Sequence, residues 1–196
     1  MKLNTSLFEG QLVYLAAINP EQDAQIESRW TLDPDYQRML GADLVRPLSP
    51  AQVKKKYAEI EKEMDEKGNQ FYFTIRRLAL EGIEDPGPLF GFARLDWVEW
   101  SHGVGSLSLG IGDPAERKKG FGADALKLLL RYAFRELNLF RISADVPAYN
   151  LAALRLFEKA AFKKEACQRE VYHLAGKRWD GLHLGLLREE WEQSPW

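Results

Sequence analysis

The sequence predicts a single α/β domain of the α+β kind, a mixed, mostly antiparallel sheet of about six or seven strands with helices on both faces. Two observations support this. Short segments rich in aromatic and β-branched residues dominate the first half of the chain, whereas strands alternate with helices in the second half. Because 196 residues are too few for two average domains of roughly 150 residues, we expect one domain over 1–196.

Composition excludes several classes of protein. With 45% hydrophobic and 12% aromatic residues, the chain is typical of a globular protein and not of a disordered one. The net charge of -2 gives no overall field that would attract nucleic acid or an anionic membrane. No apolar run approaches the roughly 20 residues that cross a bilayer, and no signal-peptide pattern opens the sequence. We expect a cytoplasmic protein without nucleic-acid or membrane partners.

Cysteine and histidine are too scattered to suggest a metal centre or an internal disulfide. Cys167 is the single cysteine, and His102, His173 and His183 lie near no second cysteine. We therefore expect no metal site, and a single cysteine fits a reducing compartment.

The first half of the chain is expected to hold an early strand, two helices and successive antiparallel strands. In order, these are a strand at 8–18, a helix from Pro20 to about Trp30, a loop or broken helix at 33–50, a helix at 51–67, and strands at 71–75, 89–97 and 106–111. A turn cluster between Gly82 and Pro88 separates two of these strands.

Helical periodicity begins after Gly120. An apolar stripe with helical spacing is formed by Leu126, Leu129, Leu130, Ala133 and Leu137. A strand over 142–146 and a helix over 151–160 follow, the helix with Asn150 as its N-cap. A hairpin over 171–187 closes the order of elements.

The run 117–122, Arg-Lys-Lys-Gly-Phe-Gly, has the composition of an anion site. It lies between the strand ending at Ile111 and the next helix, whose first N–H groups and dipole favour an anion. Gly120 and Gly122 lack a Cβ, so a phosphate can approach the backbone, and three basic residues add charge. The run is a candidate pyrophosphate cradle. The alternative is a solvated charged loop whose glycines only form the turn.

Two other phosphate motifs do not fit this segment. A P-loop requires Lys and Ser or Thr after its glycines, but here the lysines precede Gly120. Gly110-x-Gly112-x-x-Ala115 formally matches a dinucleotide fingerprint, yet Pro114 and the charged run delay the helix and no repeated βαβ units are present.

The pattern Arg-x-x-Gly-x-Gly at 117–122, between a strand and a helix, resembles the motif of the GNAT superfamily of N-acetyltransferases. The likeness continues through 139–146, Asn150 and 157–162, which look like the branch with ribosomal-protein N-terminal and spermidine acetyltransferases. It is specific over about 106–164, the expected cofactor-binding core of a GNAT-like fold.

This resemblance implies an acetyl-CoA-dependent N-acetyltransferase. The strand at 109–111 would offer backbone groups to the pantetheine and the 117–122 loop would hold the pyrophosphate. Asn150 would bond the cofactor arm, and its role as a plain N-cap is an alternative that does not exclude this. The residues expected to contact acetyl-CoA are Leu109, Gly110, Ile111, Arg117, Lys118, Lys119, Gly120, Phe121, Gly122, Ala123, Asn150 and Phe157.

Direct attack of a neutral amine on the thioester is the expected reaction, with a backbone N–H of the 109–112 strand stabilising the carbonyl oxygen. Amines with a pKa of about 8 to about 10.4 arrive mostly protonated at neutral pH, so a base is needed. The candidates are Asp96, Glu99 and His102. For His102, a solvated turn residue is the alternative.

Phe157 departs from the resemblance, because many family members carry there a tyrosine that protonates the departing thiolate. Phe cannot donate a proton. A thiol pKa of about 8.5 is only ~1.5 units above neutral, so the loss should cost on the order of 2 kcal/mol, and water or Tyr149 could substitute. Ala161 likewise replaces the usual glycine.

The acceptor is left open between a peptide N-terminus, a polyamine and a small-molecule amine. It would lie between the early helices at 21–67 and the closing hairpin, near aromatic residues for which a place in the core is the alternative: Trp30, Tyr36, Trp97, Trp100 and Trp179. An acyl-CoA sensor without turnover, kept open by Phe157, and a structural module without a cofactor are the competing functions. The sequence also leaves open whether the chain forms a homodimer.

Overall fold

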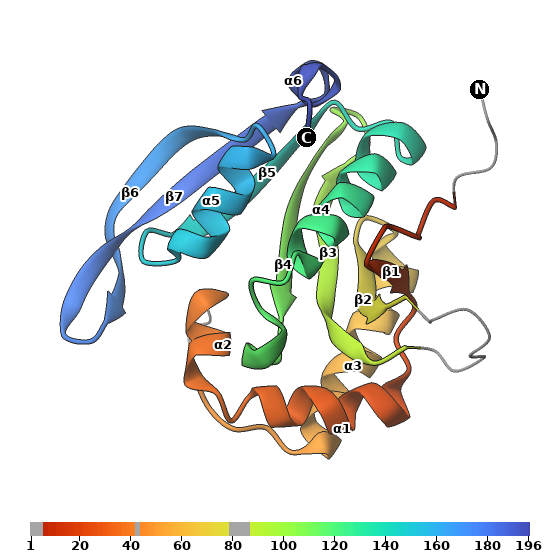
Figure 1. The fold of residues 1–196 in the computed structure, drawn as a ribbon, viewed down its shortest axis with the longest axis vertical. Helices are drawn as coiled ribbons and strands as arrows, with labels where there is room; N and C mark the ends of the chain where they lie inside the picture. Colours follow the sequence, from red (N-terminus) through yellow and green to blue (C-terminus); the bar gives the residue numbers. More distant parts are fainter. Residues whose placement is uncertain (1–5, 42–43, 79–86) are drawn as a thin grey trace.

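A seven-stranded mixed sheet with helices on both faces forms the protein in the computed structural model, which describes residues 6–41, 44–78 and 87–196 (Figure 1). The strands are β1 (Val13–Ala16), β2 (Phe71–Arg77), β3 (Leu89–Glu99), β4 (Val104–Ile111), β5 (Arg141–Pro147), β6 (Lys163–Leu174) and β7 (Lys177–Leu187). The helices are α1 (Pro20–Trp30), α2 (Pro34–Met39), α3 (Pro50–Lys67), α4 (Phe121–Arg131), α5 (Leu151–Lys159) and α6 (Arg188–Gln193). Within the described residues, no helix is long and apolar enough to cross a membrane. The predicted fold class is confirmed.

The strand order is β1-β2-β3-β4-β5-β7-β6, and within the described part of the chain only the pair β4 and β5 is parallel. A parallel pair requires a crossover connection, which α4 provides. β4 and β5 pair only from Val104 opposite Arg141 to Ser106 opposite Ser143. Beyond these residues the two strands diverge (Figure 1). This divergence, called the split below, is the feature that positions the site.

Two predicted elements differ from the observed ones. The first strand is shorter than 8–18, because residues 8–10 turn back onto it: the Gly10 N–H donates to the Val13 carbonyl and the Leu15 N–H to the Phe8 carbonyl, both at 2.8 Å. The segment 33–50, predicted as a loop or broken helix, contains the short helix α2, with Asp33 as its N-cap. β6 begins at Lys163, well before the predicted 171. The sequence did not indicate its first residues because this edge strand is exposed and lacks apolar alternation. The turn predicted at 82–88 lies, up to residue 86, outside the described residues.

Two apolar cores pack against opposite faces of the sheet. One lies under α4 and α5 and contains the predicted stripe, with Leu126, Leu129 and Leu130 fully buried. The other lies under α1 and α3, around Tyr57 and Tyr72. α1 and α3 pack beside β2 and β3. On the face of the sheet that carries these two helices, β5 and β7 therefore have polar, partly exposed side chains. We call this the open face.

A buried ion pair fastens α1 to the sheet. The Arg76 guanidinium donates to Asp23 at 2.6 Å, and the two side chains are 7% and 0% exposed. Nearby, Glu27 accepts from the Tyr57 hydroxyl and pairs with Lys56. Burial, with the Glu27 charge adding to it, raises the pKa of Tyr57 far above its usual value, so this phenol remains a donor.

Candidate functional site

The edge of β4 that faces the split presents peptide groups without a strand partner. The Gly112 N–H donates to the Phe90 carbonyl of β3 at 2.9 Å. Hydrogen-bonding direction alternates along a strand, so the peptide groups of Gly110 also face β3, whereas those of Leu109 and Ile111 face the split. The predicted strand edge is therefore placed where β4 and β5 separate.

The N-terminus of α4 is open beside this edge. Gly120 is its N-cap, with φ of 94°, a left-handed conformation that favours glycine. Among the described residues, no side chain caps this end, and the first main-chain bond runs from the Asp124 N–H to the Gly120 carbonyl. The N–H groups of Phe121, Gly122 and Ala123 are thus available to an anion.

Gly122 faces the split. A Cβ added there would lie 3.7 Å from Ile111, 3.8 Å from Leu109 and 3.9 Å from Leu156, which are ordinary van der Waals distances. The glycine is therefore not required by close packing. Its missing side chain leaves room between β4, α4 and α5, as expected where a ligand approaches the backbone.

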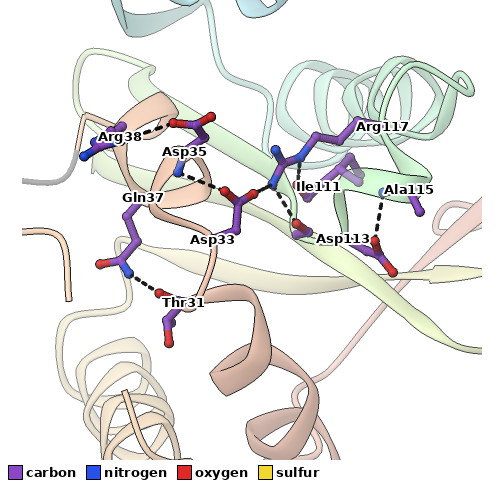
Figure 2. A network of polar contacts seen from close by, with 10 residues as sticks. Thr31, Asp33, Asp35, Gln37, Arg38, Ile111, Asp113, Ala115 and Arg117 are labelled. Carbon is purple, nitrogen blue, oxygen red and sulfur yellow. Dashed lines mark hydrogen bonds and ion pairs between the residues drawn. The ribbon is translucent and has the colours of Figure 1, made fainter. Parts of the chain in front are cut away.

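Arg117 holds the cradle in place through its side chain. Figure 2 shows its guanidinium between Asp33 (2.8 Å) and the carbonyl of Ile111 (3.2 Å), and it also donates to the Gly112 carbonyl at 2.7 Å. Asp33 also accepts the Asp35 N–H at 3.0 Å as N-cap of α2. The Arg117 side chain therefore joins the loop, the end of β4 and α2.

The two lysines of the run differ in their surroundings. Lys119 pairs with Glu116 at 3.0 Å, whereas Lys118 is exposed and has a positive φ of 64°. Both lie within the turn before α4. Cationic charge beside the open helix end therefore comes mainly from Lys118, since the Arg117 guanidinium is engaged by Asp33 and the Lys119 ammonium by Glu116.

α2 bridges the two sides of the split. On one side its N-cap Asp33 binds Arg117. On the other, the Tyr149 hydroxyl donates to the Arg38 carbonyl at 2.7 Å, and the Asn150 amide donates to the Met39 carbonyl at 2.8 Å. The helix thus spans from the cradle to the start of α5.

The structure places Asn150 and Phe157 on α5 in different surroundings. Asn150 accepts the Ala153 N–H at 3.1 Å, which confirms it as the N-cap; its contact with the cofactor stays a prediction. Phe157 is 5% exposed and packs edge-on against Phe162, with ring centroids 4.9 Å apart. Phe157 therefore lies in the core.

The three predicted bases lie toward the start of β4. Asp96 is opposite Ser106, Glu99 is opposite Val104, and His102 is in the turn that follows. At about 3.3 Å per residue, Ser106 and Val104 are roughly 10 and 17 Å along the strand from Leu109. Glu99 and His102 are exposed and are not brought to the split. Asp96 is nearest to it, and burial raises its pKa although Arg94 pairs with it at 2.8 Å.

The aromatic residues expected around the acceptor do not gather at one place. They are divided between the core, the end of β3 with its turn, and the hairpin: Trp30 and Tyr36, Trp97 and Trp100, and Trp179. Trp179 lies near the split from the hairpin, where its ring and that of Tyr172 are 5.9 and 6.0 Å from Tyr149. Trp30 lies against the end of β4, where a Cβ added to Gly112 would overlap its ring, and Tyr36 belongs to α2. Burial raises the pKa of Tyr149.

Sequence reasoning missed two ion pairs on the open face. His183 Nδ1 lies 2.8 Å from Asp145 Oδ1, and the Arg141 guanidinium binds Glu165 and lowers the pKa of that carboxyl. The first pair joins the adjacent strands β5 and β7, whereas the second reaches from β5 across β7 to β6. The alternation over 141–146 indicates that Arg141 and Asp145 lie on the polar face of a strand. The sequence does not indicate, however, that this strand pairs with β7.

Comparison with known proteins identifies a family. A model described as the acetyltransferase (GNAT) domain matches residues 13–163. The chain is 28% identical over 183 residues to an SPbeta prophage-derived uncharacterized N-acetyltransferase, YokL of Bacillus subtilis (strain 168), covering 93% of this chain and 94% of that protein. It is 25% identical over 183 residues to an N-acetyltransferase 9-like protein of Caenorhabditis briggsae, covering 87% of each.

Solved structures share the fold. Spermidine N-acetyltransferase from Vibrio cholerae, in complex with CoA and spermine, superposes with a TM-score of 0.74 at 18% identity, covering 92% of this chain and 98% of that one. RimL, a ribosomal L7/L12 α-N-protein acetyltransferase in complex with CoA, has a TM-score of 0.76 at 13% identity, covering 92% and 97%.

Proposed function

The chain belongs to the GNAT acetyltransferase family and is an acetyl-CoA-dependent N-acetyltransferase; from this premise we propose that it transfers the acetyl group by direct attack of a primary amine in a ternary complex. The observation that carries the proposal is the open N-terminus of α4 directly beside the split. An anion site is thereby adjacent to a strand edge whose peptide groups at Leu109 and Ile111 are not paired with β5, as a cofactor with a pyrophosphate and an extended arm requires.

The pyrophosphate would bind the N–H groups of 121–123. A helix N-terminus carries roughly half a positive charge, and Lys118 and Lys119 increase the local potential. The pantetheine would run along the edge at Leu109 and Ile111, with Leu156 on the opposite side. Arg117 would contribute by holding the loop, since its guanidinium is bound to Asp33 and two carbonyls.

The reaction would take place at the point where β4 and β5 separate. The Leu109 N–H faces the split and would donate to the thioester oxygen as negative charge develops there. A donor in such a position contributes about 10²–10³-fold to the rate. Holding the amine next to the thioester lowers the barrier further, because the two reactants no longer have to meet in solution.

No tyrosine acid is needed for the leaving group. Phe157 is buried and has no donor, and the Tyr149 hydroxyl is directed to the Arg38 carbonyl. Because a thiol pKa of about 8.5 is close to neutral, the thiolate can take its proton from the amine that has just reacted or from water. The absence of a tyrosine acid is therefore compatible with turnover, and turnover is what would distinguish an enzyme from a sensor that only binds acyl-CoA.

The charge pattern favours an acceptor with a single amine, a peptide N-terminus or a small molecule, over a polyamine. A polyamine is held by several carboxylates that are free to pair with its ammonium groups. Among the described residues around the split, Asp96 is paired with Arg94 and Glu165 with Arg141, and the Asp145 carboxylate is hydrogen-bonded to the His183 ring. Of the two enzymes that share the fold, RimL is the better guide to this acceptor class.

Thermal unfolding and thiol release together test the proposal. Acetyl-CoA at 100 times its Kd should stabilise the protein by about 2.7 kcal/mol, and no shift would contradict a cofactor site. Thiol release should follow addition of single-amine acceptors and be weaker with spermidine. A shift without thiol release over a broad panel would instead support the sensor.

A further inference from the structure

The open face brings a carboxylate to the border of the split. Ile142, Ala144 and Val146 are buried on the α5 side of β5, so Ser143 and Asp145 lie on the other face. Ser143 is the last residue of β5 that pairs with β4. Asp145 is two residues further, about 7 Å along the strand, and its side chain is 68% exposed.

His183 is positioned by this carboxylate. It lies opposite Asp145 in the β5 and β7 pair, with Nδ1 at 2.8 Å from the carboxylate and a side chain that is 38% exposed. When Nδ1 donates its proton to Asp145, Nε2 carries the lone pair and can accept a proton. The carboxylate also stabilises the imidazolium that results, as in other His and Asp pairs.

The other charged groups near His183 leave this arrangement intact. Arg141 of β5 and Glu165 of β6 neutralise each other, and the His183 charge is only a minor cause of the lowered Glu165 pKa. Tyr172 of β6 has its pKa raised by burial and by the Asp145 charge, so it is neutral. Asp145 is the charged group that contacts the imidazole directly.

We propose that His183, positioned by Asp145, receives the proton of the acceptor ammonium through a bridging water; this inference rests on the proposed function. The neutral amine then attacks the thioester carbon. As the carbon–sulfur bond breaks, the amine nitrogen loses its second proton and the thiolate gains one. The amide and the thiol leave, and the imidazolium returns its proton to bulk water.

Such a base selects the class of acceptor. Imidazole in general titrates near pH 6.5, an α-amine near about 8 and a lysine-type or polyamine nitrogen near about 10.4. Proton transfer to imidazole is thus uphill by about 1.5 units from an α-ammonium and by about 4 units from the others. Among these amines the α-amine is the least basic, and the test below therefore uses peptides with free α-amines.

The test compares His183→Gln and Asp145→Asn with the wild type in steady-state acetylation of peptides with free α-amines, from about pH 6 to about pH 9.5. For His183→Gln we expect kcat to fall about 100-fold near pH 7, with KM for the amine little changed. The deficit should shrink as pH rises, because free amine then forms in bulk water. Asp145→Asn should lose less, and Asp145→Glu should recover part of the loss.

His173→Gln is the matched control, since this exposed histidine of β6 lies in the pair opposite Arg178, near the hairpin turn; its kinetics should equal those of the wild type. Acetyl-CoA should stabilise every variant as it does the wild type. A His183→Gln enzyme with wild-type kcat near pH 7, or with a loss that is the same at every pH, would overturn the inference and leave the proposed function standing. A wild type that releases no thiol with any amine would overturn both. Should His183→Gln not fold, Asp145→Asn carries the same pH-dependent prediction.

Discussion

Gly122 is the residue at which cofactor binding and folding can be separated. A Cβ there meets its neighbours at 3.7 Å or more, so Gly122→Val should fold. The branched side chain would occupy the space that a phosphate needs beside the α4 N-terminus. We expect the variant to lose the thermal stabilisation by acetyl-CoA and the thiol-release activity, while its unfolding transition without ligand stays within about 1 kcal/mol of the wild type.

Ala58→Val is a suitable control for this substitution. It adds the same β-branched side chain to an exposed position of a helix, α3, on the other side of the sheet. Its acetyl-CoA stabilisation should match that of the wild type. Normal cofactor binding by Gly122→Val would show that the cradle is wrongly placed.

Single residues of the cradle were predictable only in their local roles. The neighbouring residues predict that a helix starts near Gly120, and in the structure α4 begins at Phe121 with Gly120 as its N-cap. The partner of Arg117 is Asp33, 84 positions away in the sequence. No local pattern indicates such a pair, and the sequence therefore suggested charge for the ligand where the structure shows an anchor for the loop.

At the scale of elements, the attachment of α1 to β2 depends on the buried pair of Asp23 and Arg76. Asp23→Ala would leave the guanidinium buried without its carboxylate, which costs about 3–5 kcal/mol. Urea unfolding followed by circular dichroism measures this. Glu21 lies in the same helix as Asp23 and pairs at the surface with Lys54 of α3. Glu21→Ala should therefore cost less than about 1 kcal/mol. Equal, small losses in the two variants would show that the buried pair contributes nothing specific.

Elements with local boundary signals were predicted within a few residues. Ser49 and Asn150 cap α3 and α5 as their sequences indicate, and Gly68 ends α3 in a left-handed conformation. β6 was missed over 163–170 because an exposed edge strand has no buried side to impose alternation. The π-helical turn Tyr132–Glu136, which ends the helical segment after α4, likewise has no local signature.

At the scale of the whole molecule, the function depends on a feature that no segment encodes alone. β4 and β5 pair over three residues and then diverge, and α2 contacts both sides of the split. Family resemblance pointed to the donor side of this site. The open face, where His183 meets Asp145 across 38 residues of sequence, arises from strand order and could not be predicted from spacing.

Two-substrate kinetics test the central claim, direct transfer in a ternary complex. Initial rates of thiol release would be measured over a grid of acetyl-CoA and amine concentrations, with the mass of the protein followed in the absence of amine. The account predicts reciprocal plots that intersect and a chain that carries no acetyl group. Parallel lines together with an acetylated chain would contradict it, because they require a covalent intermediate.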